Sequence, residues 1–281
     1  MRKRMVALVG ATLLTLAALA PASAITKNYV KDFDHPFVGL AAFYDGAGDF
    51  SHRCSGSLLS PTVFLTAGHC TDDGAGGVMA SARIWFQQDA GTRFDGVQDP
   101  VTGYPDACLS QPCATATEMY NYGFDNFVGF PDTHDAGIVI LDTPIYLNEY
   151  GTLAPVGALD ALLGTARGQK DTTFLASGYG LSYSSPVAFE SFRERLMGYG
   201  KLTNLKSANT AGFNLQTNGN GQGNGATCSG DSGGPIFWPA DSNQIVAVTS
   251  FGLNPWCRGV DFSYRVDTAA VQRWIDSVTG G

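Results

Sequence analysis

The chain has 281 residues, of which 44% are hydrophobic and only 15% are charged. This composition excludes an intrinsically disordered chain, which needs high charge and little apolar content to stay unfolded. The 35 glycines and 13 prolines favour many turns over long helices. A formal net charge of −8 would repel a phosphate backbone, so we expect no nucleic-acid partner.

The first 24 residues have the pattern of a secretory signal peptide. Residues 2–4 are basic, residues 5–20 are almost wholly apolar, and small residues precede Ile25. A membrane anchor is the alternative, but the apolar run is shorter than the ~20 residues that a membrane-spanning helix needs. We therefore expect removal of residues 1–24 and an acidic, extracellular protein without membrane attachment. We also expect it to be a monomer.

After Ile25 the sequence consists of short apolar and β-branched runs bounded by Gly, Pro, Asp and Asn. Such runs are typical of antiparallel sandwiches and barrels, and the lack of helices between them disfavours a parallel α/β fold. Strands are expected over residues 37–43, 57–59, 63–66, 83–87, 136–141, 171–176 and 244–250.

The last element is expected to be an amphipathic helix. Apolar residues over 271–278 recur at i, i+3, i+4 and i+7, as on one face of a helix. Asp267 and Thr268 are both candidates for its N-cap, and Gly280 lies beyond its end.

All six cysteines follow the expected cleavage point, and an even number in an extracellular chain predicts three disulfides. Spacing alone leaves many pairings open, although Cys108 and Cys113 are close enough for a local bridge. A zinc site is the rival interpretation, but the cysteines lack paired C-x-x-C spacing, so we expect no metal. The six are Cys54, Cys70, Cys108, Cys113, Cys228 and Cys257.

Residues 228–235, Cys-Ser-Gly-Asp-Ser-Gly-Gly-Pro, place Ser232 on a tight glycine-rich turn. Successive N–H groups of such a turn can point at one spot, where those of Gly230 and Ser232 would stabilise an oxyanion. A serine hydroxyl is a poor nucleophile unless a base removes its proton. The turn therefore predicts a nucleophilic serine if a histidine lies nearby.

The order of residues along the chain discriminates between hydrolase folds, because all four histidines precede Ser232. The G-x-S-x-G elbow of α/β-hydrolases needs a histidine after the serine. The subtilisin order needs an aspartate before the histidine, and neither Asp45 nor Asp49 suits that role. The order His-Asp-Ser remains, which belongs to the chymotrypsin fold. The histidines are His35, His52, His69 and His134.

Two segments resemble the histidine and serine signatures of the trypsin/chymotrypsin-like serine proteases, in their secreted, bacterial form. Residues 66–70 read Thr-Ala-Gly-His-Cys, and residues 230–235 read Gly-Asp-Ser-Gly-Gly-Pro. The similarity extends over nearly all of the chain after residue 24. It implies an all-β fold of two packed six-stranded antiparallel β-barrels with a C-terminal α-helix. The barrels would comprise residues 25–152 and 153–281.

The resemblance implies hydrolysis of protein or peptide substrates through an acyl-enzyme, without a cofactor. His69 would be the general base and Ser232 the nucleophile. Asp135 is the expected third member, because the apolar strand after it resembles the one that follows the family's aspartate; Asp132 and Asp142 are the alternatives. The alternative functions are a catalytically inactive, protease-like binding protein and a secreted esterase with the same triad.

The resemblance also places the base of the primary specificity pocket six residues before Ser232, at Ala226. A neutral residue there implies no preference for Arg or Lys, and small walls favour an apolar residue in the substrate. Trp256 departs from the family pattern near this pocket. The pocket residues implied are Ala226, Thr227, Ser250, Phe251, Gly252 and Gly259.

Two disulfides follow from the resemblance: Cys54–Cys70 beside the histidine, and Cys228–Cys257 beside the serine loop. Cys108–Cys113 would be the third.

The resemblance further suggests how the site becomes ordered. In animal members of the family a newly formed N-terminus pairs with the aspartate before the nucleophile, which is Asp231 here. Cleavage of the signal peptide would expose Ile25. We expect its ammonium group to pair with Asp231 and to order the N–H of Gly230.

Overall fold

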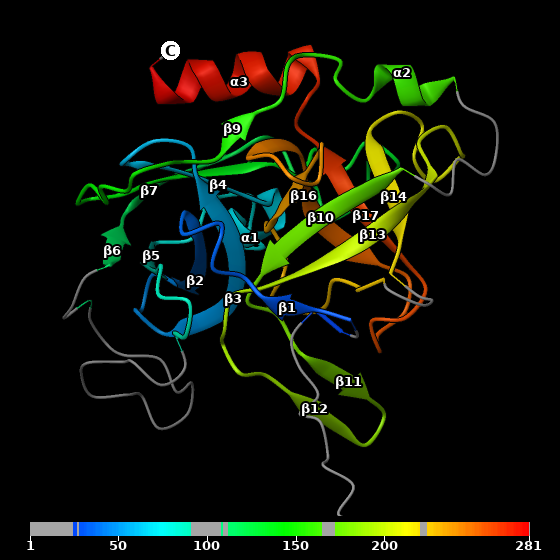
Figure 1. The fold of residues 1–281 in the computed structure, drawn as a ribbon. Helices are drawn as coiled ribbons and strands as arrows, with labels where there is room; N and C mark the ends of the chain where they lie inside the picture. Colours follow the sequence, from blue (N-terminus) through cyan, green and yellow to red (C-terminus); the bar gives the residue numbers. More distant parts are fainter. Residues whose placement is uncertain are drawn as a thin grey trace, which may run out of the picture.

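The computed structural model describes residues 25–26, 28–90, 108, 112–164, 172–219 and 224–280. The predicted signal peptide, residues 1–24, lies outside the described residues, as does Asp171 at the start of one predicted strand. Within the described ranges, no helix is long and apolar enough to cross a membrane. Figure 1 shows two sheets side by side with α3 (Ala269–Thr279) along one end.

The first sheet is an antiparallel, nearly closed barrel. Its strands are β2 (Val38–Tyr44), β3 (Phe50–Leu58), β4 (Val63–Thr66), β5 (Ser81–Trp85), β6 (Cys113–Ala116), β7 (Glu118–Asn121) and β8 (Gly137–Ile140). They follow the order β6-β5-β2-β3-β4-β8-β7. Because β6 and β7 are consecutive in the chain, residues 113–121 form one extended segment, broken at Thr117, that reaches both edges. The predicted six-stranded barrel is confirmed with this one broken strand.

The second sheet is a closed barrel with two short additions. Its strands are β10 (Thr173–Gly178), β13 (Leu196–Asn204), β14 (Asn214–Asn218), β15 (Pro235–Phe237), β16 (Gln244–Gly252) and β17 (Val260–Arg265). The order β13-β10-β15-β16-β17-β14 closes where β14 pairs with β13. β1 (Val30–Lys31) extends the sheet beside β13, and β9 (Thr152–Leu153) runs parallel to β16. β1 thus joins the second sheet although it precedes the first along the chain.

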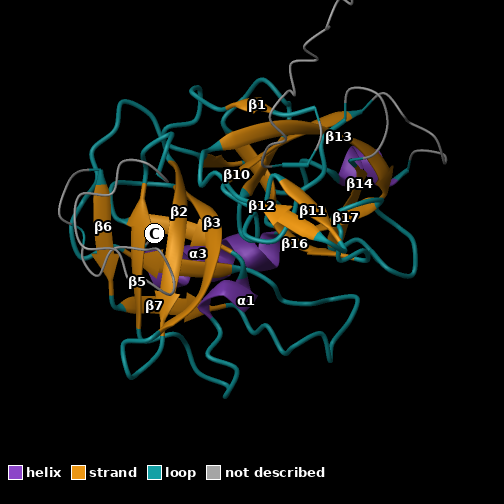
Figure 2. Ribbon diagram, turned by 90° about the horizontal axis from the view of Figure 1, so that it is seen from below, coloured by secondary structure: helices purple, strands orange, loops and turns teal. Residues whose placement is uncertain are grey.

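The remaining elements are small. β11 (Tyr183–Ser185) and β12 (Ala188–Glu190) form a separate hairpin, and α2 (Asp160–Leu163) is a single turn. The other single-turn helix, α1 (Gly68–Thr71), lies at the junction of the two barrels, as Figure 2 shows from below.

Glycines allow close packing inside the first barrel. Gly39 pairs with Gly56 across β2 and β3. A Cβ on Gly56 would lie 2.4 Å from the ring of Phe64, and one on Gly39 would lie 3.1 Å from the same ring. Phe64 is fully buried there, a burial that stabilises the fold by about 1.5–3 kcal/mol.

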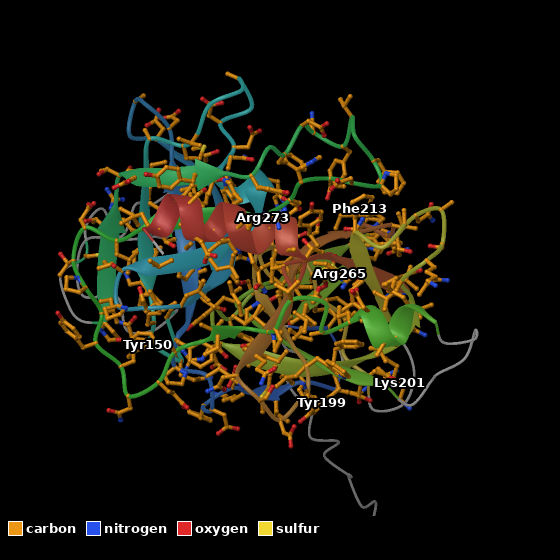
Figure 3. All side chains as sticks on the ribbon, turned by 90° about the horizontal axis from the view of Figure 1, so that it is seen from above. Tyr150, Tyr199, Lys201, Phe213, Arg265 and Arg273 are labelled. Carbon is orange, nitrogen blue, oxygen red and sulfur yellow. A yellow bond between two sulfur atoms is a disulfide. The ribbon has the colours of Figure 1, made fainter. Side chains whose placement is uncertain are left out.

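The C-terminal helix α3 is confirmed, and its N-cap is Thr268. The Thr268 hydroxyl accepts the Val271 N–H, while Gly280 ends the helix in the left-handed conformation. Asp267, the other candidate, instead pairs with Arg265 of β17 at 2.8 Å. Arg265, labelled in Figure 3, also pairs with Asp160 at 2.8 Å and so fixes the chain before α3 to α2.

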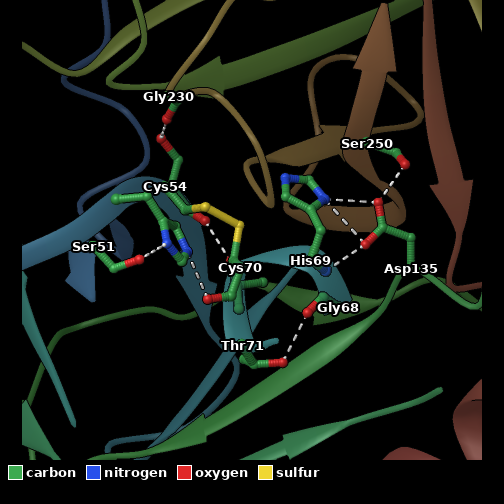
Figure 4. Close-up of a disulfide and its surroundings, with 12 residues drawn as sticks. Ser51, Cys54, Gly68, His69, Cys70, Thr71, Asp135, Gly230 and Ser250 are labelled. Atoms are coloured by element: carbon green, nitrogen blue, oxygen red, sulfur yellow. Dashed lines mark hydrogen bonds and ion pairs between the residues drawn. A yellow bond between two sulfur atoms is a disulfide. The ribbon is translucent and has the colours of Figure 1, made fainter. Parts of the chain in front are cut away.

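The structure contains all three predicted disulfides, Cys54–Cys70, Cys108–Cys113 and Cys228–Cys257. The first joins β3 to α1 (Figure 4). The third joins the chain before the Ser232 turn to the loop between β16 and β17. Two bridges therefore fix the segments on which the predicted site residues lie.

Candidate active site

His69 and Asp135 meet because their strands are paired. His69 follows β4 and Asp135 precedes β8, and the register of Thr66 with Gly137 brings both to one end of the sheet. His69 Nδ1 lies 2.9 Å from Asp135 Oδ2, and the His69 N–H donates to Oδ1 at 2.7 Å (Figure 4). The His69 side chain is 24% exposed, whereas that of Asp135 is fully buried. With Nδ1 on the carboxylate, Nε2 is the nitrogen that can accept a proton.

The two alternative aspartates lie elsewhere. Asp132 accepts the hydroxyl of Tyr264 at 2.7 Å, and Asp142 accepts two threonine hydroxyls on the first barrel. Neither is hydrogen-bonded to His69 in the described part of the chain. The geometry therefore favours Asp135 as the partner of His69.

The ion pair shifts both pKa values. Burial alone would lower the pKa of His69, but the charge and hydrogen bond of Asp135, with a contribution from Asp72, raise it above its ordinary value. Burial alone would raise the pKa of Asp135, but the charge and hydrogen bond of His69, together with a hydrogen bond from Ser250, lower it. The result is an ionised carboxylate beside an imidazole that takes up a proton more readily than usual.

Ser250 has a contact that the sequence did not indicate. Predicted only as a pocket residue, it donates its hydroxyl hydrogen to Asp135 Oδ2 (Figure 4). Ser250 lies on β16 of the second barrel, so side chains of both barrels hold the Asp135 carboxylate.

The turn that carries Ser232 packs tightly against the turn that carries His69. A Cβ on Gly233 would lie 2.1 Å from Thr66 Oγ1 and 2.6 Å from Ala67 N, and Gly233 has a φ of +77°. Only glycine allows this approach. Among the described residues, no hydrogen bond joins Ser232 Oγ to His69 Nε2; in ligand-free active sites this bond is often long and tightens when substrate binds.

Among residues 230–234 of the Ser232 turn, two N–H groups have no acceptor in the described structure. Those of Asp231, Gly233 and Gly234 donate to backbone carbonyls at 2.9, 2.7 and 2.8 Å. Those of Gly230 and Ser232 donate to no acceptor within the described ranges. These two N–H groups are the ones predicted to receive an oxyanion.

Asp231 is nearly fully buried beneath this turn. Its carboxylate accepts the N–H groups of Gly180 and Cys228 at 2.8 and 2.9 Å. Burial raises the pKa of Asp231 to about 6, although these hydrogen bonds and the charge of Arg53 act in the opposite direction.

Ile25, the other predicted member of the activation pair, is also fully buried. Its side chain packs against Gly198, where an added Cβ would lie 2.7 Å from Ile25 Cγ2. The next residue, Thr26, forms a β-bridge with Ala226, six residues before Ser232. No ion pair or hydrogen bond between Ile25 and Asp231 is present among the described residues.

A cavity of about 200 Å³ opens beside Ser232. Four of the six predicted pocket residues line it, whereas Ala226 and Gly259 do not. The four are Thr227, Ser250, Phe251 and Gly252.

The cavity also contains an acid that was not predicted. Asp261 of β17 is 6% exposed, lines the cavity and accepts the N–H of Thr227 at 2.9 Å. In the sequence, the only feature that could have indicated this pocket residue is its position four residues after Cys257.

Aromatic rings extend from His69 to this cavity. Phe124 lies 5.8 Å from the His69 ring and 5.2 Å from Phe127. Phe127 lies 5.3 Å from Phe251, which lines the cavity. The segment before Asp135 thus provides an apolar surface next to the site.

A second group of the same residue types lies buried between the barrels. His35 Nδ1 is 2.9 Å from Asp32 Oδ1, and Ser177 donates its hydroxyl hydrogen to Asp32 Oδ2. Because the serine bonds the carboxylate and not the imidazole, His35 is not placed to activate it. The contacts instead fasten the chain after β1 to β10.

Cys54, Cys70 and His69 form a group whose ligand atoms lie within 4.8 Å of one another. The two sulfur atoms are joined in a disulfide and supply no thiolate for a metal ion.

Comparisons with known proteins agree with this geometry. The family model described as Trypsin matches residues 30–275. The chain is 28% identical over 221 residues to fibrinolytic enzyme isozyme C of Lumbricus rubellus, covering 73% of this chain and 78% of the relative. It is 26% identical over 241 residues to brachyurin of Leptuca pugilator, covering 83% and 90%.

Among solved structures, HL collagenase superimposes with a TM-score of 0.61 over 88% of this chain and 94% of the other. At 18% identity this likeness concerns the fold alone.

Proposed function

We propose, from the premise that this chain belongs to the trypsin family of serine endopeptidases, that it hydrolyses peptide bonds with His69, Asp135 and Ser232 as its catalytic triad. Family membership makes it a serine protease that acts on proteins or peptides; the assignment of the triad is our proposal. The expected signal peptide and the three disulfides support action outside the cell. We expect it to act as a monomer.

The proposed reaction gives each group of the site a role. Ser232 Oγ attacks the substrate carbonyl while His69 Nε2 accepts its proton, and Asp135 stabilises the imidazolium. The N–H groups of Gly230 and Ser232 hold the oxyanion. His69 then donates the proton to the departing amine, and a water molecule repeats the sequence on the acyl-enzyme.

One arrangement carries the proposal. The unpaired N–H groups of Gly230 and Ser232 lie on the turn that contains the Ser232 hydroxyl. That turn packs against the turn of His69, whose imidazole is hydrogen-bonded to Asp135. Each unpaired donor has a use in this reaction, since losing one oxyanion donor costs roughly 3–4 kcal/mol of barrier. A binding protein without activity has no need for such donors.

The test compares substitutions at the triad with a matched aspartate outside it. We expect Asp135→Asn to lower the rate of casein cleavage by about 10⁴-fold and Ser232→Ala to lower it by about 10⁶-fold. Asp142→Asn, which alters the rejected alternative, should retain the wild-type rate. Near-normal cleavage by Ser232→Ala would contradict the proposal. A short-chain ester hydrolysed by a wild type that leaves casein intact would indicate an esterase.

We also propose that the processed N-terminus completes the site. The Thr26–Ala226 bridge already anchors the start of the described chain beside the segment that enters the Ser232 turn. An ammonium group freed at Ile25 would be a suitable partner for the buried Asp231, because a buried carboxylate is stabilised by an opposite charge.

For substrate preference, the aromatic surface next to the cavity, which includes Phe251 in its wall, supports an apolar residue on the acyl side of the cleaved bond. We propose that such residues are accepted, without exclusive preference for Arg or Lys.

A further inference from the structure

A second cavity, of about 670 Å³, is lined by none of the residues proposed for catalysis. Its wall includes residues 33–36 after β1, Glu149 before β9, and side chains of β10 and β13, three strands that lie side by side in Figure 1. We call it the β10–β13 cavity. Its volume is within the range of ligand-binding pockets in proteins, yet the proposed reaction gives it no role.

The His35 imidazole provides this cavity with a hydrogen-bond acceptor. Burial alone would raise the pKa of Asp32, but the hydrogen bond and charge of His35, with contributions from Ser177 and Arg195, lower it below its ordinary value. The ionised Asp32 carboxylate lies 2.9 Å from His35 Nδ1 and holds the imidazole proton there, which leaves the lone pair on Nε2.

The Nε2 atom of His35 has no hydrogen-bond partner in the described part of the chain. The His35 side chain is only 8% exposed and its ring is stacked on that of Phe237 at 4.5 Å, yet the residue lines the cavity. With one ring nitrogen on Asp32 and one ring face on Phe237, Nε2 is the polar atom that His35 presents to a ligand.

Three carboxylates from separate segments surround the same cavity. Asp34, Glu149 and Asp241 all line it, and all three are exposed. Asn243 donates its side-chain N–H to Glu149 Oε2 at 3.0 Å. The described lining includes no lysine or arginine that would neutralise these acids. Three negative charges together with an acceptor nitrogen favour a ligand that is a cation and donates hydrogen bonds.

The wall between these polar groups is apolar and aromatic. Tyr199 of β13, labelled in Figure 3, is paired with Leu175 of β10, and both line the cavity. Tyr199 is 40% exposed and Phe33, also in the wall, is 66% exposed. Aromatic rings attract ammonium and guanidinium groups, and apolar surface accommodates the methylene stems of lysine and arginine.

A metal ion is the alternative ligand, because many metal-binding histidines donate their other ring N–H to a carboxylate. Among the described residues, however, His35 belongs to no group of three possible ligands whose atoms lie within 4.8 Å of one another. The spacing of the acids and the size of the cavity therefore favour an organic cation.

We propose that the β10–β13 cavity binds a lysine or arginine side chain of another protein. The cationic group donates a hydrogen bond to His35 Nε2 and is attracted by Asp34, Glu149 and Asp241. The cavity is thus a docking site for a basic protein segment. This role goes beyond the proposed function and does not depend on it, since no triad residue lines the cavity.

The test observes the four histidine rings by nuclear magnetic resonance in the processed Ser232→Ala protein, which should leave the added peptide uncleaved. The His35 signal is assigned by substituting each of the other three histidines in turn. We expect the peptide acetyl-Lys-Ala-Lys-amide to shift the His35 signal saturably. The neutral peptide acetyl-Gln-Ala-Gln-amide should leave it unchanged at the same concentration.

Two double variants of equal charge separate the cavity from general attraction to an acidic protein. Asp34→Asn with Asp241→Asn should weaken binding of the lysine peptide by about 5-fold. Asp49→Asn with Asp276→Asn is the matched control, because both aspartates are exposed and lie outside the cavity. It should retain the reference affinity.

Four results would overturn the inference. They are no shift of the His35 signal, the same shift with the neutral peptide, equal weakening in the two double variants, and a shift caused by zinc chloride but not by the lysine peptide. A peptide that shifts only the His69 signal would place binding in the catalytic cleft and would also overturn it. Each of these results leaves the protease assignment intact, because casein cleavage by the wild type tests that assignment separately.

Discussion

The close packing of Gly233 makes Gly233→Ala the substitution that most directly perturbs the relation between Ser232 and His69. The added Cβ would lie 2.1 Å from Thr66 Oγ1, 2.5 Å from Ser55 O and 2.6 Å from Ala67 N. Two of these atoms are backbone atoms of packed segments, so the Ser232 turn has to move. The φ of +77° adds strain for any residue with a side chain.

The expected cost combines two effects. A left-handed conformation costs about 1–2 kcal/mol for a residue other than glycine, and overpacking costs about 1–3 kcal/mol. We therefore expect Gly233→Ala to lower the free energy of unfolding by about 2–5 kcal/mol. Displacement of Ser232 by about 1 Å should also lower kcat/KM by about 100-fold in the molecules that remain folded.

Denaturant unfolding followed by circular dichroism measures the stability, and kcat/KM is measured without denaturant, where the variant is folded. Gly46→Ala is the matched control, since a Cβ on Gly46 would meet nothing within 4 Å. It should leave both quantities nearly unchanged. Wild-type stability and activity in Gly233→Ala would show that the two turns do not pack as described.

Three other predictions follow from the buried charges. The acid limb of kcat/KM for a neutral peptide should have its midpoint above pH 6.5, because Asp135 raises the pKa of His69; a midpoint below pH 6 would contradict this pairing. The free energy of unfolding of Asp261→Asn minus that of the wild type should increase from pH 4 to pH 8, by at most about 4 kcal/mol. The difference has this sign because the pKa of Asp261 is raised to about 7 in the folded protein, so the wild type loses stability as the carboxyl group ionises. The same stability difference at pH 4 and pH 8 would refute this prediction. An extra Met before the processed Ile25 should strongly lower activity without unfolding the protein, and full activity with the extension confirmed by mass spectrometry would exclude N-terminal insertion.

Features that depend on local sequence could be predicted, and among them the final helix is confirmed, whereas the catalytic roles of the site residues stay predictions. The turn motifs placed His69 and Ser232, the apolar strand after Asp135 singled out that aspartate, and the apolar periodicity gave the final helix. These features depend on a few neighbouring residues, which a single sequence displays directly.

Residues set by long-range strand pairing were not predicted. Asp261 enters the cavity only because β17 pairs with β16 in a register that places it opposite Gly252, and nothing near it in the sequence fixes that register. The Ser250 contact with Asp135 spans 115 residues and joins two barrels. Composition and local motifs do not indicate which residues so far apart in the chain come into contact.

The central claim is that Ser232 is a nucleophile activated by His69. The most direct measurement treats the secreted, processed protein with a fluorophosphonate and locates the label by peptide mass spectrometry, with His69→Ala treated in parallel. We predict one label, on Ser232, with a rate that falls by at least about 10³-fold in His69→Ala. A label on another residue, an unlabelled wild type, or equal labelling of both proteins would contradict the account.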